Sequence, residues 1–85
     1  MAVAHMIEPR AEHVLVKDRE LVVILAGGDE IHAPLEEFPR LRDASPQDLA
    51  DNRLIAGGIG IQWKSLDEDL SVAALARRFG RQRLA

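Results

Sequence analysis

Hydrophobic and polar residues alternate along the first third of the chain. In residues 12–17 (EHVLVK), Val14 and Val16 share one side of the chain. A period of two residues is typical of a β-strand with one buried face. Residues 21–25 (LVVIL) form a continuous aliphatic run, and residues 30–33 (EIHA) form a shorter apolar segment. The pattern therefore predicts three short strands.

Two turn signals separate these strands. Asp18 and Arg19 leave room for a two-residue connection between the first and the second strand. Gly27, Gly28 and Asp29 supply the second turn, because glycine adopts the positive φ that tight hairpins require. Three strands joined by two tight turns predict an antiparallel meander.

The middle of the chain follows a helical period that proline interrupts. Leu35, Phe38 and Leu41 recur at a spacing of three residues, which places them on one helical face. Pro39 lies inside this run and either restarts or bends the helix, because it has no N–H to donate and crowds the preceding turn. Residues 45–48 (SPQD) predict a second helix start, with a capping serine, a proline at the first helical position and an acid three residues after the cap.

The next apolar segment predicts further strand structure. Residues 53–55 and 59–63 indicate either one more strand pair or a single bent strand. Gly57 and Gly58 separate the two runs, and Gly60 breaks the alternation of the second. Glycines at such positions indicate a β-bulge or the close approach of another backbone.

The last helix has the clearest pattern in the chain. Its apolar residues follow the i, i+3, i+4, i+7 spacing of a helix with one face on a core, and they are Val72, Leu75, Ala76 and Phe79. Gly80 is the predicted stop signal. We expect an acidic cluster at the N-terminal end of this helix and basic residues at its C-terminal end, both favourable to the helix dipole. They are Asp67, Glu68 and Asp69, and Arg77, Arg78, Arg81 and Arg83.

These elements predict a single α+β domain over residues 11–80. The antiparallel meander and the further strand or strands would be packed against the C-terminal helix and the short middle helices, which gives two layers. Residues 1–10 are expected to be a flexible N-terminus or the remnant of a tag, and residues 81–85 a basic C-terminal tail.

Composition narrows the class of protein. The chain has 85 residues, of which 47% are hydrophobic and 29% are charged, as in a small folded domain with one modest core. It has no cysteine, which excludes disulfides and thiolate zinc sites and fits a reducing compartment. The net charge is −3, so the chain as a whole is not suited to phosphate. We expect a cytoplasmic protein, because neither a signal peptide nor an apolar run of about 20 residues is seen.

The sequence contains no pattern that indicates catalysis, so we expect neither an enzyme nor a cofactor. In the glycine-rich run 57–60 (GGIG), the glycine that precedes lysine in a phosphate loop is missing. Trp63 occupies the place where a dinucleotide fingerprint needs glycine or alanine. His13 and His32 could face each other across the sheet and bind zinc, but their spacing favours ordinary strand residues.

Two charged clusters and the single tryptophan remain as candidate binding residues. The acidic cluster is either a capping turn of the last helix, a patch for a protein partner, or a metal-binding or catalytic group. The arginines are either a solvated helix end or contacts for nucleic-acid phosphates. The tryptophan anchors either the core or an interface. The candidate protein contacts are thus Trp63, Asp67, Glu68 and Asp69, and the candidate nucleic-acid contacts are Arg77, Arg78, Arg81 and Arg83.

Two parts of the chain resemble one bacterial family. The first is residues 33–41 (APLEEFPRL), followed by residues 44–46 (ASP). The second is residues 57–63 (GGIGIQW), followed by residues 66–72 (LDEDLSV), and it is the more specific of the two. Together they resemble the domains of unknown function grouped as family 2442, over roughly residues 11–79.

The resemblance implies a small α+β fold without enzymatic activity. Many such domains are encoded beside another small protein, in an arrangement like a toxin–antitoxin pair, and are then its antitoxin-like member. This chain departs from the family at Gln62 and Lys64, which stand where His-Trp-Pro is usual around the tryptophan, so no role of that histidine carries over. It also has Ala74 and Leu75, then an arginine-rich extension, where the family tends to end in paired leucines.

Three functions are consistent with these observations. The first is a non-enzymatic protein-binding domain, the antitoxin-like member of a gene pair, with a small toxin-like protein as its partner. An exposed sheet edge in such a domain is suited to pairing either with a second copy, which would give a homodimer, or with a strand of the partner. The second is a nucleic-acid-associated regulatory domain, whose affinity would fall steeply with salt. The third is a phage or mobile-element inhibitor of a host nuclease complex, which needs an acidic surface. None of the three involves a membrane.

Overall fold

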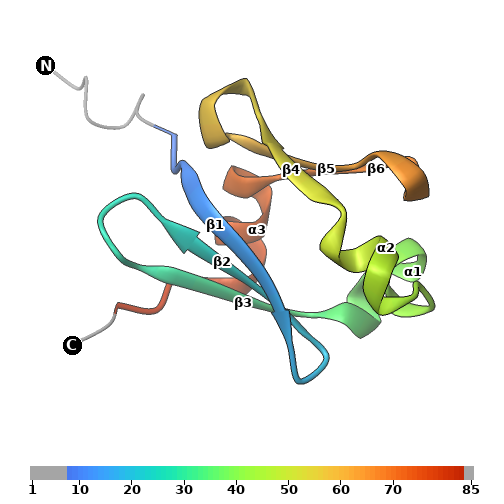
Figure 1. Cartoon of the computed structure of the whole chain (residues 1–85). Coiled ribbons are helices and arrows are strands. Elements are labelled where there is room, and N and C mark those ends of the chain that lie inside the picture. The colour runs from blue at the N-terminus through green and yellow to red at the C-terminus, as the bar shows by residue number, and fades with distance from the viewer. Residues whose placement is uncertain (1–7, 84–85) are drawn as a thin grey trace, which may run out of the picture.

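The computed structural model describes residues 8–83, whose strands form two separate antiparallel sheets. The first sheet has the order β1 (Ala11–Lys17), β2 (Glu20–Leu25) and β3 (Glu30–Pro34). The second has the order β4 (Asn52–Ile55), β5 (Gly60–Trp63) and β6 (Glu68–Ser71). The helices are α1 (Pro39–Arg42), α2 (Pro46–Ala50) and α3 (Val72–Phe79) (Figure 1). This arrangement confirms the predicted α+β class.

The expected N-terminal extension lies only in part within the described residues. Of residues 1–10, the first seven fall outside them, as do residues 84 and 85 of the expected basic tail. Within residues 8–83, no helix is long and apolar enough to cross a membrane.

The first sheet is the predicted meander. Asp18 and Arg19 form its first turn with φ values of 53° and 64°, the positive values that a two-residue type I′ hairpin needs. Gly27 and Gly28 form the second turn, also with positive φ. The ladder between β1 and β2 shifts register once, between Ala11 and His13. The three expected strands and both turns are therefore confirmed.

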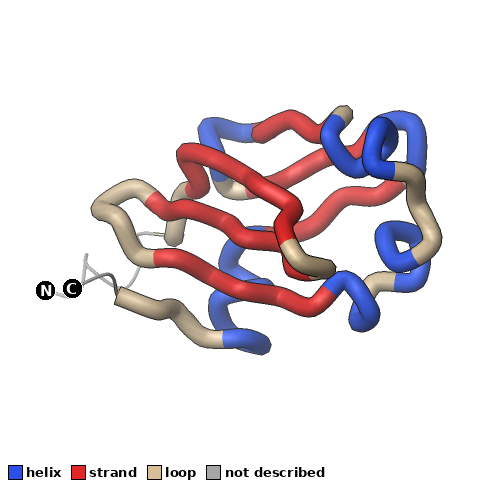
Figure 2. The backbone as a smooth tube through the Cα atoms, turned by 60° about the horizontal axis from the view of Figure 1, so that its bottom comes forward, coloured by secondary structure: helices blue, strands red, loops and turns tan. Residues whose placement is uncertain are grey.

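One face of the first sheet supplies much of the hydrophobic core. Its alternate residues are buried, and they are Leu21, Val23, Leu25, Ile31 and Ala33. α3 lies against this face and also contacts β6, so it joins the two sheets (Figure 1). Val72 and Leu75 of α3 are buried, as the helical spacing predicted. Figure 2 shows α3 on one side of the first sheet and the short helices gathered at one end.

The middle segment is a series of short helical turns. Leu35, Phe38 and Leu41 are all buried, as their spacing predicted. A 3₁₀ turn ends before Pro39, and Pro39 restarts the chain as α1. The Ser45 hydroxyl accepts a hydrogen bond of 3.1 Å from the backbone N–H of Asp48, which confirms the predicted cap of α2.

The second sheet differs from what the sequence predicted. Of the two alternatives for residues 53–63, the strand pair is correct. Gly57 and Gly58 lie in the turn between β4 and β5, and Gly58 shows the expected close approach of another backbone, since an added Cβ would lie 2.5 Å from the carbonyl oxygen of Ala11. The placement of the acidic cluster at the start of the last helix is wrong, because Glu68 and Asp69 belong to β6 and Ser71 caps α3. These further strands form a sheet of their own instead of extending the first.

The segment after α3 is part of the fold. Gly80 ends the helix as predicted. Gln82 then pairs with Glu30 of β3 through two backbone hydrogen bonds of 2.6 and 2.7 Å. Arg81 and Arg83 lie 3.4 and 3.9 Å from the carboxylate of Asp29. Residues 81–83 therefore run along the edge of the first sheet rather than leaving the domain as a tail.

Candidate protein interface

The face of the first sheet that points away from α3 is the best candidate for a binding surface. We call it the outer face. Strand register arranges it in three rows across β1, β2 and β3, namely His13–Ile24–Glu30, Leu15–Val22–His32 and Lys17–Glu20–Pro34. In Figure 1 the helix α3 lies behind this sheet, on its opposite side. Leu15, 49% exposed, is the one exposed large hydrophobic residue among residues 8–83.

The outer face has an apolar centre and a polar rim. Leu15, Val22 and Ile24 are neighbours on two adjacent strands. Val22, which pairs with Leu15 on one side and with His32 on the other, is only 8% exposed. Charged or ionisable residues surround this centre on all three strands. An apolar centre with a polar rim is the usual anatomy of a protein–protein interface.

The rim contains one ordered polar cluster. The His32 ring lies between two carboxylates, with Nδ1 3.1 Å from Glu20 Oε1 and Nε2 2.8 Å from Glu30 Oε1. Both ring nitrogens can donate to carboxylates only when the imidazole is protonated. Hydrogen bonds to Glu20 and then to Glu30 raise the pKa of His32, against a smaller opposing effect of burial.

This cluster predicts that stability depends on pH. The raised pKa of His32 means that protonation stabilises the folded chain. The contribution is fully present below about pH 6.5, the ordinary histidine pKa, and is lost as pH rises through the folded-state value. Unfolding by urea should show a stability difference between wild type and His32→Gln that shrinks by up to about 1 kcal/mol between roughly pH 5.5 and 8.5. An equal difference at both pH values would contradict the charged cluster.

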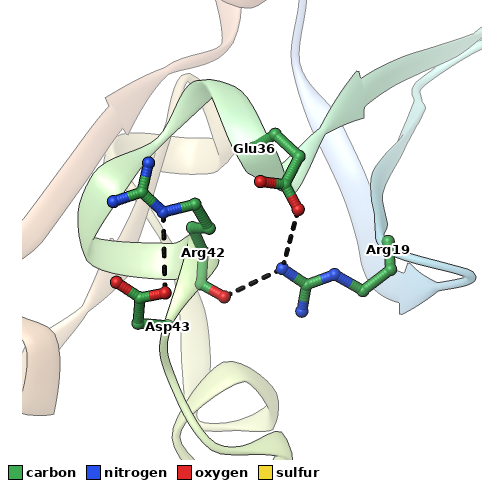
Figure 3. A network of polar contacts seen from close by, with 4 residues as sticks. All are labelled: Arg19, Glu36, Arg42 and Asp43. Carbon is green, nitrogen blue, oxygen red and sulfur yellow. Dashed lines mark hydrogen bonds and ion pairs between the residues drawn. The ribbon is translucent and has the colours of Figure 1, made fainter.

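The end of the outer face near the first turn is fixed to α1. Arg19 donates to Glu36 Oε2 at 3.2 Å and to the backbone carbonyl of Arg42 at 2.9 Å (Figure 3). Arg42 in turn lies 3.5 Å from the carboxylate of Asp43. The β1–β2 turn is thus tied to the short helices, although Arg19 is more than half exposed and these ion pairs are individually weak.

The structure assigns Trp63 to the core. Its side chain is fully buried, and its indole Nε1 donates a 3.0 Å hydrogen bond to the carbonyl of Leu49. Of the two alternatives given by the sequence, the core anchor is therefore the one observed. The indole presents no surface to a partner.

The acidic residues do not form one patch. Asp67 has a left-handed backbone and an exposed side chain, and Arg40 donates to its backbone carbonyl at 2.9 Å. Glu68 pairs with Trp63 in the ladder and points toward the core side, whereas Asp69 pairs with Gln62 on the opposite side. Alternation along β6 thus separates Glu68 from Asp69, and Asp67 lies in the turn before the strand.

The arginines are engaged by residues of this chain. Arg78 forms an ion pair with Glu37, and its guanidinium lies 4.8 Å from the centre of the Phe79 ring. Arg81 and Arg83 pair with Asp29, while Arg77 is an exposed residue of α3. Three of the four candidate nucleic-acid contacts therefore have an intramolecular role.

The two strand histidines lie apart. His13 and His32 occupy different rows, on the two outer strands of the first sheet, so they do not face each other. No group of three potential metal ligands is found within the described part of the chain. Sequence reasoning missed the outer face, because the alternation in each strand gives its two faces but not the register that brings Ile24 beside His13 and Glu30.

These features define a small α+β domain with an uncovered, mixed sheet face. A family model described as "Protein of unknown function (DUF2442)" matches residues 11–81, and the chain belongs to this family. Its structure is similar to the crystal structure of a protein of unknown function from Rhodospirillum rubrum, with a TM-score of 0.76 and 28% identity over 86% of this chain and 90% of that chain.

A second solved structure shares the fold. The solution structure of an uncharacterized protein from Chromobacterium violaceum has a TM-score of 0.69 and 23% identity, over 80% of this chain and 64% of that chain. No curated protein matches the sequence. The resemblance to family 2442 is thereby confirmed, and the relatives add the fold but no activity.

Proposed function

We propose that this domain is a non-enzymatic protein-binding module that receives a small partner protein on its outer face. Its role would be that of the antitoxin-like member of a gene pair. The observation that carries the proposal is the outer face itself, where Leu15, Val22 and Ile24 form an apolar centre inside a charged rim. The hydrophobic core of this chain is small. A partner that covers the outer face would bury further apolar area, and this burial stabilises an association.

The chemistry of the rim indicates what the partner would carry. The His32 cluster brings the carboxylates of Glu20 and Glu30 to the rim of the apolar centre, and Lys17 lies on β1 directly across from Glu20. A complementary partner would place aliphatic or aromatic side chains at its centre and a basic group toward Glu20 and Glu30. Such charge matching acts mainly on specificity and on the rate of association.

The hydrogen bonds of His32 to Glu20 and Glu30 also support a non-enzymatic role. Within residues 8–83, His32 is the group whose pKa is clearly displaced, and displaced pKa values often accompany catalytic sites. Here, however, Glu20 and Glu30 occupy both ring nitrogens, so neither is free to take a proton from a substrate. The cluster is better suited to ordering the sheet surface.

The two alternative functions receive less support. A phosphate backbone would have to compete with Asp29 and Glu37 for Arg78, Arg81 and Arg83. An inhibitor that imitates nucleic acid needs a continuous acidic surface, and alternation along β6 separates Glu68 from Asp69.

The test is capture of the partner by tagged domain from an extract of the native cells, at low and at high salt. Ile24→Lys places a charge at the apolar centre, between His13 and Glu30. The matched control is Gln62→Lys, which lies on the central strand of the second sheet between Arg53 and Asp69. We expect wild type and Gln62→Lys to retain one small protein at both salt concentrations, and Ile24→Lys to retain at least about tenfold less.

Circular dichroism of both variants controls for folding. Equal retention by a folded Ile24→Lys would exclude the outer face as the binding surface. Retention of nucleic acid alone, lost at high salt, would instead favour the arginine-based alternative.

A further inference from the structure

The free edge of β1 carries unpaired backbone groups. β1 is the outermost strand of the first sheet, and its two-residue turn makes Lys17 and Glu20 the pair that closes the hairpin. In such a hairpin the closing pair is hydrogen-bonded, and bonded and non-bonded pairs then alternate along the ladder. The N–H and C=O groups of Val14 and Val16 therefore point away from β2, toward the edge.

Hydrogen bonds at the opposite edge of the sheet, along β3, confirm this alternation of bonded and non-bonded pairs. Ile24 and Glu30 are a non-bonded pair by the same count, so the backbone groups of Glu30 should point outward from β3. They do, because both of them bond to Gln82, at 2.6 and 2.7 Å. The chain thus covers one edge of this sheet with its own C-terminal segment.

The edge of β1 borders an open groove instead. The groove has a volume of about 470 Å³ and is lined by Val14, Leu15 and Val16 on one side and by residues of α2, including Pro46 and Leu49, on the other. Side chains alternate along a strand, so three consecutive residues can line one groove only along the strand's edge. The edge of β1 at residues 14–16 therefore faces this groove.

The other end of the same edge is closed. At Gly58, in the turn between β4 and β5, an added Cβ would lie only 2.5 Å from the carbonyl oxygen of Ala11. The accessible part of the edge thus begins beyond the first residues of β1 and ends at its turn. An occupant has to be a short extended segment.

We propose that this occupant is β1 of a second copy, paired antiparallel about a twofold axis through Leu15. The stretch Val14-Leu15-Val16 reads the same in both directions. A twofold axis at its centre places Val14 opposite Val16 of the second copy, and the reverse, as two hydrogen-bonded pairs. These pairs satisfy the edge groups of both valines in each chain, with four hydrogen bonds in all.

The same axis places the most exposed apolar side chains of the two copies next to each other. Leu15 faces Leu15 of the second copy as a non-bonded pair, the type in which opposite side chains lie closest. The valines of the second copy then lie over the groove beside Pro46 and Leu49. The edge is complementary to itself, because Val14 pairs with Val16 of the second copy and Leu15 pairs with Leu15. This self-complementarity favours a second copy over an unrelated strand.

Pairing of this kind extends beyond the proposed function. It joins two three-stranded sheets into one continuous sheet of six strands and brings the two outer faces side by side. The dimer would then present two partner sites on one surface. Because few residues of each strand pair, we expect a concentration-dependent equilibrium rather than a permanent dimer.

Single cysteines test both the pairing and its register, because the chain has no cysteine of its own. Leu15→Cys should cross-link with itself under mild oxidation, since non-bonded antiparallel pairs have Cα atoms about 4.5 Å apart, within disulfide range. His13→Cys alone should not, because the axis places His13 opposite Lys17. A mixture of His13→Cys and Lys17→Cys should form the mixed disulfide. Lys64→Cys, an exposed residue after β5, is the control for random collision.

We expect at least about tenfold more covalent dimer from Leu15→Cys than from Lys64→Cys at equal concentration. Equal yields from these two variants would overturn the proposal. Self-linking of His13→Cys as strong as that of the mixture would overturn the antiparallel register.

A second measurement needs no cysteine. Sedimentation of the wild-type chain should show a mass that rises with concentration toward that of a dimer. Ala50→Trp fills the groove beside β1 and should shift the midpoint of this rise to at least about tenfold higher concentration, whereas Ala74→Trp, on the exposed side of α3, should not. A wild-type chain that stays monomeric up to about 1 mM would refute the dimer.

Discussion

Replacing Trp63 with alanine is expected to cause the largest loss of stability of any substitution considered for this domain. The indole is fully buried between the second sheet and α2, and its N–H bonds to the carbonyl of Leu49 at 3.0 Å. Truncating a buried tryptophan costs about 3–5 kcal/mol, and it also removes one of the two side-chain hydrogen bonds that the Leu49 carbonyl accepts, the other coming from Asn52. Small domains are stable by only about 5–15 kcal/mol in total. Urea unfolding followed by far-UV circular dichroism measures the loss, because Trp63 is also the only tryptophan fluorophore.

Two further variants separate packing from hydrogen bonding. Trp63→Phe keeps an aromatic ring in the core but loses the N–H, so a smaller loss of about 1–3 kcal/mol is expected. Gln62→Ala changes the neighbouring residue, which points to the opposite side of β5, and should change stability by less than about 0.5 kcal/mol. A Trp63→Ala chain that loses less than about 1 kcal/mol would contradict the assignment of this residue as the core anchor.

Gly58→Ala is expected to have the next largest effect on stability. Gly58 has a φ of +96°, and a Cβ there would lie 2.5 Å from the carbonyl oxygen of Ala11. The substitution therefore combines backbone strain with a backbone clash that no side-chain movement can relieve. We expect a loss of about 2–4 kcal/mol in the free energy of unfolding.

Gly28→Ala is the matched control. Gly28 has nearly the same φ, +102°, but no atom lies within 4 Å of the added Cβ. Only the strain remains, which is about 1–2 kcal/mol. The difference between the two variants measures the contact that joins the second sheet to β1, and equal losses would mean that this contact is unimportant.

Several charged side chains stabilise the fold through contacts within the chain. Arg81 and Arg83 hold the C-terminal segment against Asp29, and Arg78 lies over aromatic rings beside Glu37. These cations are engaged within the chain, whereas the outer face has an uncovered apolar centre, which is the basis of the proposed function. The edge of β1 borders the same face, so pairing of two chains and binding of a partner would occur on one surface.

Local signals in the sequence determined most of the individual elements. The alternation in residues 12–17, the two hairpin turns, the cap at Ser45 and the apolar stripe of α3 each depend on neighbours only a few residues away. Their preferences act over that range in any fold, so they could be predicted correctly. For Pro39 the sequence left two outcomes, a restarted or a bent helix, and the structure shows that it restarts the chain as α1.

Only the tertiary structure decided how these elements combine. β6 contains a single strongly apolar residue, Leu70, and forms because its backbone pairs with β5 and because Leu70 packs on the core. The sequence allowed Trp63 to anchor either the core or an interface, and packing placed it in the core. The outer face and the free edge of β1 arise from register and from which strands end a sheet, and these follow from contacts between residues far apart in the chain. The sequence pattern therefore determined most of the elements, and long-range packing determined β6 and the surface that the elements present.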